Sequence, residues 1–270
     1  MSREHITNQS VDWKTYLDQY HEKNAGITER LLLRAEAPNI GTPYEWLASK
    51  IKNVPGTNQA PLSILDIGCG SAPMKSLLPI HWNYLGIDLS VAELRKAREA
   101  GRAQVILADA TRIPLAANSM DGAISSMAMM LVSPIELALS ETFRVIKPGA
   151  VFAFTRPSIA PFWPRDLLVG FNLVSSLRAL PAMPQRFTKR RIQGLLESCG
   201  FVGIRHEGKR FSFKLCTADD AKLLVDSLYL PGMADAHKLR AANKLATWAS
   251  KGREIPITLA MSVARKNGSL

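Results

Sequence analysis

A short segment in the first third of the chain, residues 63–73, constrains the fold more than any other part of the sequence. It reads Ser-Ile-Leu-Asp-Ile-Gly-Cys-Gly-Ser-Ala-Pro, so that an apolar run containing Asp66 is followed by Gly68 and Gly70. A helix-compatible stretch opens at about Ala72. This order predicts a buried strand, a tight turn whose backbone can approach a ligand, and a helix N-terminus that faces the same ligand. Such a turn is typical of proteins that bind an adenine-containing cofactor.

The dinucleotide-binding pattern G-x-G-x-x-G fits this segment poorly. Gly68 and Gly70 supply its first two glycines, but its third position is Pro73. A proline ring cannot give the close helix–strand packing that a glycine allows at that position. Asp66 lies just before the turn, where an acid would repel cofactor phosphates but would attract a cationic group such as an α-ammonium. The pattern therefore favours a nucleoside that carries an amino acid over NAD.

At these residues the sequence resembles the class I S-adenosylmethionine-dependent methyltransferases, in particular the branch called methyltransferase type 11. The first family motif is acid-x-Gly-x-Gly-x-Gly, and here Ala72 stands in place of its third glycine. The resemblance covers residues 60–156, and four further family elements follow the first in order. They are Tyr84–Leu89, Asp109–Ala110 after an apolar run, Ser119–Ile124 and Arg144–Gly149.

The resemblance implies S-adenosylmethionine as the cofactor and a set of residues that hold it. Asp88 would accept hydrogen bonds from both ribose hydroxyls, and Asp109 would lie near the adenine amino group. We interpret Cys69 as a small buried residue of the turn and not as a nucleophile. No metal ligands are predicted. The predicted cofactor-binding residues are Asp66, Gly68, Cys69, Gly70, Asp88, Leu89, Asp109, Ala110 and Ser125.

The order of apolar and helical segments predicts an α/β fold with a doubly wound, mostly parallel, Rossmann-like sheet. Four hydroxyl-x-x-acid patterns predict capping boxes at helix starts. These are Thr42 with Glu45, Ser90 with Glu93, Ser133 with Glu136, and Thr217 with Asp220. The expected strands are 63–67, 83–88, 104–108, 121–127 and 150–156, then 201–205 and 210–215 joined near Gly208, and 255–265. The expected helices are 72–78, 90–100, 134–146 and 187–199.

Two appendages to this core are expected. Residues 1–56 form a helical N-terminal cap, and residues 57–270 form the methyltransferase domain. Within that domain, residues 157–186 are rich in Pro, Phe and Leu and follow the fifth strand. Ligands of open α/β sheets bind at this edge, so we expect a helical lid over the substrate pocket. The alternative is a packed helical pair without ligand contact.

Composition limits the setting and the partners of the chain. The longest uncharged stretch, Gly122–Ile135, has 14 residues, too few to span a bilayer. Three cysteines without paired spacing predict no disulfide framework and a reducing cytoplasm. The net charge is +11, and residues 157–270 hold 18 basic and only 8 acidic groups. This excess indicates either an acidic partner such as nucleic acid or a solvated basic surface.

The functional hypothesis is methyl transfer from S-adenosylmethionine to a small or medium organic acceptor. No fixed general base is evident, and Tyr20 and His21 are the weak catalytic candidates. The segment Ser125–Ala128 lacks the Asp/Asn-Pro-Pro-aromatic motif of enzymes that methylate base amino groups. Two alternatives stay open: an RNA methyltransferase that uses the basic C-terminal third, and a non-catalytic protein that binds the cofactor. The sequence indicates no oligomeric state.

Overall fold

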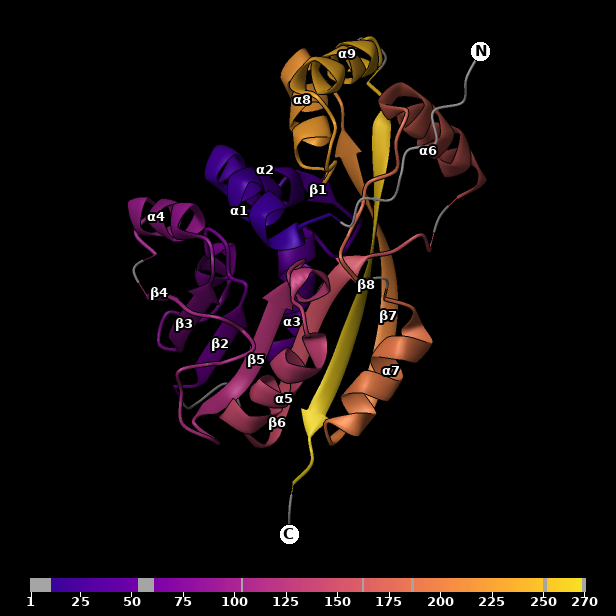
Figure 1. The fold of residues 1–270 in the computed structure, drawn as a ribbon. Coiled ribbons are helices and arrows are strands. Elements are labelled where there is room, and N and C mark those ends of the chain that lie inside the picture. Colours follow the sequence, from indigo (N-terminus) through magenta and orange to yellow (C-terminus); the bar gives the residue numbers. More distant parts are fainter. Residues whose placement is uncertain are drawn as a thin grey trace.

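An eight-stranded sheet runs through the part of the chain described by the computed structural model, which is residues 11–52, 61–102, 104–161, 163–185, 187–249 and 252–268 (Figure 1). The strand order is β1-β7-β8-β6-β5-β2-β3-β4. Strands β6, β5, β2, β3 and β4 are parallel, whereas β8 is antiparallel to both β6 and β7. The strands are β1 (Ala35–Glu36), β2 (Ser63–Ile67), β3 (Asn83–Asp88), β4 (Val105–Leu107), β5 (Met120–Ser126), β6 (Ile146–Pro157), β7 (Phe201–Lys214) and β8 (Glu254–Lys266).

Helices cover both faces of this sheet. Residues alternate between the faces along a strand, and in β6 Val151 and Ala153 join one buried cluster while Phe152 and Phe154 join another. Helix α3 packs over the first cluster, and α5 and α7 pack over the second (Figure 1). The helices are α1 (Trp13–Asn24), α2 (Ile27–Leu32), α3 (Pro43–Lys52), η1 (Pro73–Leu77), α4 (Val91–Glu99), η2 (Met129–Leu131), α5 (Ile135–Val145), α6 (Pro164–Leu177), α7 (Lys189–Ser198), α8 (Ala218–Asp226) and α9 (Asp235–Ala246).

A third buried cluster lies where the long strands β7 and β8 extend past the rest of the sheet. Leu177 of α6, Leu224 of α8 and Leu245 of α9 meet Phe213 of β7 there. Figure 1 shows these three helices together at one end of the molecule, beyond α1 and α2. Helices α6, α8 and α9 therefore form a small lobe on the extended strands.

The predicted α/β class and the mostly parallel sheet are confirmed. Two of the local predictions that are wrong concern β7 and the start of α5. Residues 201–205 and 210–215 belong to one strand, β7, because Gly208 pairs with Ala260 of β8 and the strand continues through it. Ser133 caps no helix, because Pro134 occupies the N-cap of α5 without a side-chain cap.

The N-terminal region is more closely joined to the sheet than a separate cap would be. Its strand β1 pairs with β7, and its helix α3 covers one sheet face. The expected boundary at 56/57 lies outside the described residues. Among the described helices, none combines the length and the apolar character needed to cross a membrane.

Candidate active site

The turn after β2 is built from residues that can adopt a left-handed backbone. Gly68 has φ +64° and Gly70 has φ +54°. A Cβ on Gly68 would lie 2.2 Å from the Cβ of Ala128, so only glycine fits there. Ala72, in place of the third family glycine, also has a positive φ of +57°. After it the chain forms the short 3-10 helix η1 and not the predicted α-helix 72–78.

Asp88, at the end of β3, holds the glycine turn in place. Its Oδ2 accepts a hydrogen bond from the backbone N–H of Gly70 at 2.8 Å, and its Oδ1 accepts one from Ser90 at 2.8 Å. Burial raises the pKa of the Asp88 carboxyl, and the two backbone N–H groups oppose that rise. A carboxylate has about four lone-pair sites, so Asp88 can still accept hydrogen bonds from a ligand's hydroxyl groups.

Asp66 has one carboxylate oxygen without a partner. It is 1% exposed; its Oδ2 accepts a hydrogen bond from the Tyr84 hydroxyl at 2.7 Å, and its buried Oδ1 has no hydrogen-bond partner. Burial raises the pKa of this carboxyl to about 7. A buried acid with an unused oxygen suits a cationic ligand group, because such a group would compensate the buried charge.

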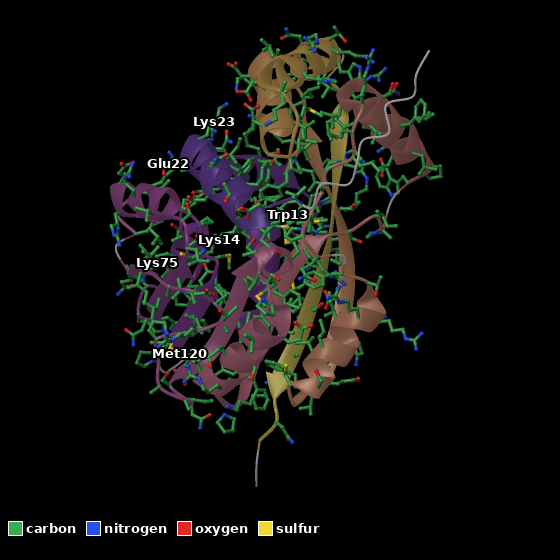
Figure 2. All side chains as sticks on the ribbon, in the orientation of Figure 1. Trp13, Lys14, Glu22, Lys23, Lys75 and Met120 are labelled. Carbon is green, nitrogen blue, oxygen red and sulfur yellow. The ribbon has the colours of Figure 1, made fainter. Side chains whose placement is uncertain are left out.

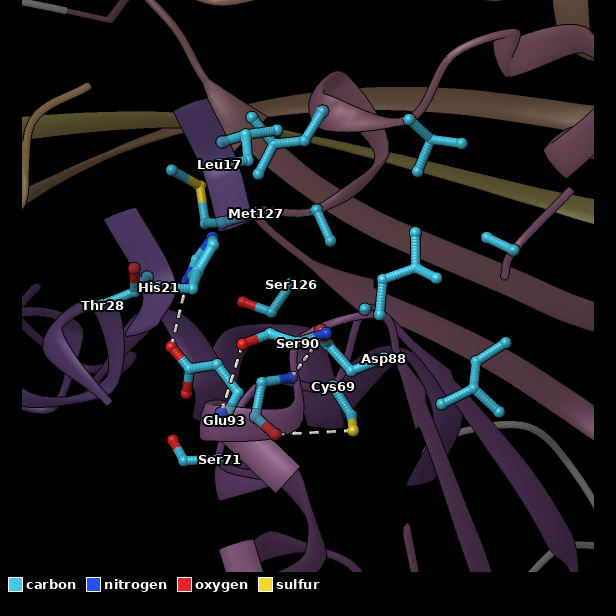
Figure 3. Close-up of a pocket in the computed structure, with 18 of the residues that line it drawn as sticks. Leu17, His21, Thr28, Cys69, Ser71, Asp88, Ser90, Glu93, Ser126 and Met127 are labelled. Atoms are coloured by element: carbon cyan, nitrogen blue, oxygen red, sulfur yellow. Dashed lines mark hydrogen bonds and ion pairs between the residues drawn. The ribbon is translucent and has the colours of Figure 1, made fainter. Parts of the chain in front are cut away.

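These residues line one cavity of about 860 Å³ at the C-terminal ends of the parallel strands (Figure 3). Asp109 lies there too, with Oδ1 accepting hydrogen bonds from the backbone and the hydroxyl of Thr111, both at 2.8 Å. Burial raises the pKa of the Cys69 thiol, which agrees with its interpretation as a buried residue of the turn. The predicted cofactor residues in the cavity wall are Asp66, Gly68, Cys69, Gly70, Asp88, Leu89, Asp109 and Ala110.

Ser125 is the predicted cofactor residue that the structure places elsewhere. Its side chain is fully buried on the opposite face of β5, and the cavity wall contains its neighbour Ser126 instead. The Ser126 hydroxyl lies 3.4 Å from that of Thr155 on β6. Because side chains alternate along a strand, an error of one position moves the residue to the other face.

Helix α1 covers the cavity. Its wall includes Trp13, Leu17 and His21 from this helix. Figure 2 places Trp13 near the middle of the molecule and Lys23 at the outer end of α1, and Figure 3 shows Leu17 beside Met127. The helix is held over the cavity by tyrosines on its other side. The Tyr16 hydroxyl accepts a hydrogen bond from the Leu230 N–H at 2.8 Å.

The segment 157–186, expected to be the lid, packs elsewhere. Of its described residues, Pro184 alone is in the cavity wall. Leu177 packs in the third buried cluster, and the Trp163 ring contacts two guanidinium groups, with Arg165 at 4.2 Å and Arg210 at 4.4 Å from its centroid. The structure therefore corrects the lid assignment: α1 takes that place, and α6 belongs to the lobe with α8 and α9.

The two catalytic candidates have different positions. The Tyr20 hydroxyl donates a hydrogen bond to the backbone carbonyl of Asp226 at 2.8 Å, and Tyr20 is buried outside the cavity wall. His21 lines the cavity, and its Nδ1 lies 3.2 Å from Oε1 of Glu93 (Figure 3). Burial raises the pKa of the Tyr20 hydroxyl, so it stays protonated. Only His21 has a place from which it could act.

Sequence reasoning assigned Glu93 only a capping role and missed its place in the site. Ser90 caps the Glu93 N–H as predicted, but the Glu93 carboxylate does not return to Ser90. Its Oε2 accepts a hydrogen bond from the Gly26 N–H at 2.9 Å instead. Other wall residues that the sequence did not single out are Thr28, Glu29, Tyr44 and Tyr229. They come from segments far apart in the chain, so no local pattern could have found them.

The residues present fit S-adenosylmethionine. The unpaired Oδ1 of Asp66 suits an α-ammonium, and the remaining lone pairs of Asp88 suit ribose hydroxyls. The left-handed turn at Gly68 and Gly70 exposes backbone to the cavity without side chains. The acids in the wall would oppose the pyrophosphate of a dinucleotide.

Comparison with known sequences agrees with this assignment. The profile of the methyltransferase-domain family matches residues 65–154, a third of the chain. A malonyl-[acyl-carrier protein] O-methyltransferase of Salmonella typhimurium is 38% identical over 34% of this chain and 38% of its own length. The enzyme of the same name from Methylococcus capsulatus is 28% identical over 55% of both chains. A demethylmenaquinone methyltransferase of Beutenbergia cavernae is 31% identical over 38% of this chain and 45% of its own. The chain thus matches about half or less of the length of these relatives.

Solved structures share the fold over nearly the whole chain. Haemonchus contortus phosphoethanolamine N-methyltransferase 2, in complex with S-adenosyl-L-methionine, has a TM-score of 0.59 and 16% identity over 96% of this chain and 61% of that one. The [4+2]-cyclase SpnF has a TM-score of 0.58 and 18% identity over 94% of this chain and 96% of that one. The family match identifies residues 65–154 as a methyltransferase domain, and the solved structures show that the whole chain shares the fold of such enzymes.

Proposed function

We propose that this protein transfers a methyl group from S-adenosylmethionine to a small or medium organic acceptor bound beneath α1. The observation that carries the proposal is that one cavity of about 860 Å³ joins the acids and glycines of the cofactor motif to an apolar wall. That wall includes Leu17 of α1, Met127 and Leu131. A cavity of this size and character is typical of small-molecule sites.

In the proposed site Asp88 would hold the ribose hydroxyls, Asp66 the α-ammonium, and Asp109 the adenine amino group. When bound, S-adenosylmethionine supplies a methyl group already activated by its sulfonium. The protein's part is to orient the acceptor and to exclude water. Holding the acceptor in line with the methyl group makes the reaction effectively unimolecular. Helix α1 covers the cavity and fits that second task.

His21 is the residue that we propose accepts a proton from a hydroxyl or amine acceptor. Glu93 lies against its Nδ1 at 3.2 Å, and an acid there would hold the ring orientation and stabilise the imidazolium that forms. The other ring nitrogen would then meet the acceptor. A carboxylate acceptor would need no base, because it is already ionised at neutral pH.

The two alternatives receive less support. Methylation of RNA rests on the basic C-terminal third, but several of its charges have partners within the protein. Arg210 pairs with Asp166 at 2.6 Å, and Lys266 donates to backbone carbonyls including Phe143 at 2.6 Å. A role without methyl transfer has one specific precedent in the fold, because a cyclase shares it. Methyl transfer must therefore be measured directly.

Two measurements test the proposal. Calorimetry with S-adenosylmethionine and S-adenosylhomocysteine, with NAD as the control, should show binding of the first two only. The protein is then incubated with radiolabelled donor and fractionated cell extract, and label should enter small molecules. Label in RNA would favour the first alternative, and donor binding without any transfer would favour the second. Tight NAD binding without donor binding would contradict the assigned cofactor.

The proposed setting is the cytoplasm. Cys69, Cys199 and Cys216 are all free thiols in the structure, which suits a reducing compartment.

A further inference from the structure

Arg156, near the end of β6, is a buried cation without a partner. It is 4% exposed, and its Nε is buried without a hydrogen bond. Within the described part of the chain, no hydrogen bond or ion pair involves its guanidinium. Arginine stays charged in proteins, and a buried, uncompensated charge costs free energy unless a partner is supplied. Nothing in the cofactor site described above uses this residue.

A second polar group without a partner lies on the same face of the sheet. Ser125 of β5 is fully buried, and its hydroxyl oxygen has no hydrogen bond. Ser125 pairs with Phe154 of β6, two residues before Arg156, so both side chains point to the face covered by α5 and α7. The two unpaired groups are therefore diagonal neighbours on adjacent parallel strands.

The surroundings of Arg156 are positively charged. Burial lowers the pKa of His206, and the nearby charges of Arg156 and Lys189 lower it further. Both nitrogens of the His206 ring are occupied, Nδ1 with Ser262 Oγ and Nε2 with Gln193 Oε1, each at 2.9 Å. Among the described residues no acid bonds directly to Arg156 or His206, and the acid nearest in the hydrogen-bond network, Glu197, accepts from Gln193 at 2.6 Å. An anion is therefore the ligand that would compensate this cluster.

The cluster lies beside the proposed acceptor cavity. Thr155, which precedes Arg156, contacts Ser126 and accepts a hydrogen bond from the Met127 N–H at 3.2 Å. Ser126 and Met127 both line the cavity. On the other side, the loop at Pro161 packs over Gly208, where a Cβ would come within 2.8 Å of the proline Cδ. Arg156 thus lies on β6, between the strand β5 that leads into the cavity wall and β8, near the edge where ligands bind, although neither Arg156 nor Ser125 is itself in that wall.

We propose that Arg156 and the Ser125 hydroxyl form an anion-binding site that takes a carboxylate or phosphate group of the methyl acceptor. A planar guanidinium binds either group through two parallel hydrogen bonds, and a serine hydroxyl can donate one more. That the bound anion belongs to the methyl acceptor rests on the proposed function. That Arg156 binds an anion does not depend on it.

The test measures anion binding without any methyl transfer. The thermal midpoint of the full chain is followed against sodium malonate and, separately, sodium phosphate, with sodium chloride keeping the ionic strength constant. A ligand that binds only the folded state raises the midpoint in a saturable way. We expect this rise in the wild type and in the control Arg95→Met, which removes an exposed arginine of α4. Arg156→Met should weaken anion binding at least tenfold, and Ser125→Ala should weaken it less.

Two further measurements separate a loss of anion binding from a loss of folding. Without anions, Arg156→Met should unfold at or above the wild-type midpoint, because it removes an uncompensated buried charge. Arg156→Lys keeps the charge and should retain part of the anion effect. Whichever of malonate and phosphate raises the thermal midpoint at the lower concentration shows whether the site prefers a carboxylate or a phosphate group. Equal anion effects in the wild type and Arg156→Met, or no saturable effect of either anion, would overturn the proposal. Failure of the proposed function would instead appear as loss of S-adenosylhomocysteine binding with the anion effect intact.

Discussion

Glu93 of α4 accepts a hydrogen bond from the backbone N–H of Gly26 at 2.9 Å, which joins α4 to the turn between α1 and α2. The same carboxylate lies 3.2 Å from Nδ1 of His21, and its side chain is 5% exposed. One buried acid therefore joins α1, which covers the cavity, to α4, the helix that follows β3.

The first prediction concerns this acid. Glu93→Ala leaves the Gly26 N–H and the His21 ring without their partner, and an unsatisfied buried donor costs about 1–3 kcal/mol. We expect chemical denaturation to show a loss of that size, and calorimetry to show weaker binding of S-adenosylhomocysteine. Glu99→Ala, at the exposed end of the same helix, is the matched control. Equal stability of the two variants would show that Glu93 does not hold α1.

The second prediction separates binding from transfer at His21. His21→Phe keeps an aromatic ring in the cavity wall but removes the proton acceptor. A positioned base typically contributes about 10²–10⁴-fold to a rate, so label transfer to a hydroxyl or amine acceptor should fall by at least about 10²-fold. The affinity for S-adenosylhomocysteine should change little. His81→Phe changes an exposed histidine outside the cavity wall and serves as the control. Unchanged transfer would mean that the acceptor needs no base.

Much of the fold and of the cofactor site could be predicted because the signals are local. Strands Ser63–Ile67 and Asn83–Asp88 begin and end where the apolar runs do. Parallel strands end at one edge of a sheet, so the acids at or near their C-terminal ends, Asp66, Asp88 and Asp109, had to lie at the same edge. The Gly-x-Gly pattern predicted a tight turn, and both glycines of the turn have the positive φ angles that glycine adopts without steric cost.

The cover of the cavity could not be predicted from local sequence. Whether α1 or α6 lies over the site depends on contacts between distant segments. Tyr16 and Tyr20 of α1 bond to the backbone at Leu230 and Asp226, more than 200 residues further along the chain. An amphipathic pattern shows that a helix buries one face, but it does not show against which partner. The unpaired polar groups of Ser125 and Arg156 likewise can be recognised as neighbours only when the strand register is known.

The third prediction concerns Asp88. The structure shows that its carboxylate also holds Gly70 and Ser90, so truncation to alanine would damage the turn itself. Asp88→Asn keeps the shape and one acceptor oxygen, so it can keep one of the two backbone hydrogen bonds, and a thermal melt checks that the variant is folded. A hydrogen bond to a charged group is worth about 1.5–3 kcal/mol, so calorimetry should show about ten- to hundredfold weaker S-adenosylhomocysteine binding. Asp121→Asn, an acid on β5 outside the cavity wall, should bind as the wild type does. Wild-type affinity in folded Asp88→Asn would limit this acid to a structural role.

The fourth prediction follows from the corrected lid. Leu17 of α1 lines the cavity, whereas Leu168 of α6 is exposed and lies outside its wall. Leu17→Ala should therefore lower label transfer, because the cavity loses part of its apolar cover and admits water. Leu168→Ala is the matched control and should transfer label at the wild-type rate. The reverse order would restore α6 as the lid.

The last prediction uses the pKa of Asp66, which burial raises to about 7 from an ordinary value of 3.8. An acid with a raised folded-state pKa stabilises the protein below its unfolded pKa, and this contribution is lost as the pH rises through 7. The free protein should therefore lose up to about 4 kcal/mol of stability between about pH 4 and pH 8 from this group. A bound α-ammonium reverses the effect, because it favours the charged carboxylate and lowers its pKa.

Binding of S-adenosylhomocysteine should consequently release a proton below pH 7 and become tighter as the pH rises from about 5.5 to 8, by up to about tenfold per pH unit below the pKa. Calorimetry in two buffers of different ionisation enthalpy measures the released proton directly. Asp66→Asn can still accept the hydrogen bond from Tyr84 but cannot ionise, so its affinity should be lower and independent of pH over this range. If Asp66→Asn keeps the pH dependence of the wild type, the titrating group is another residue of the cavity, and the ammonium does not pair with Asp66.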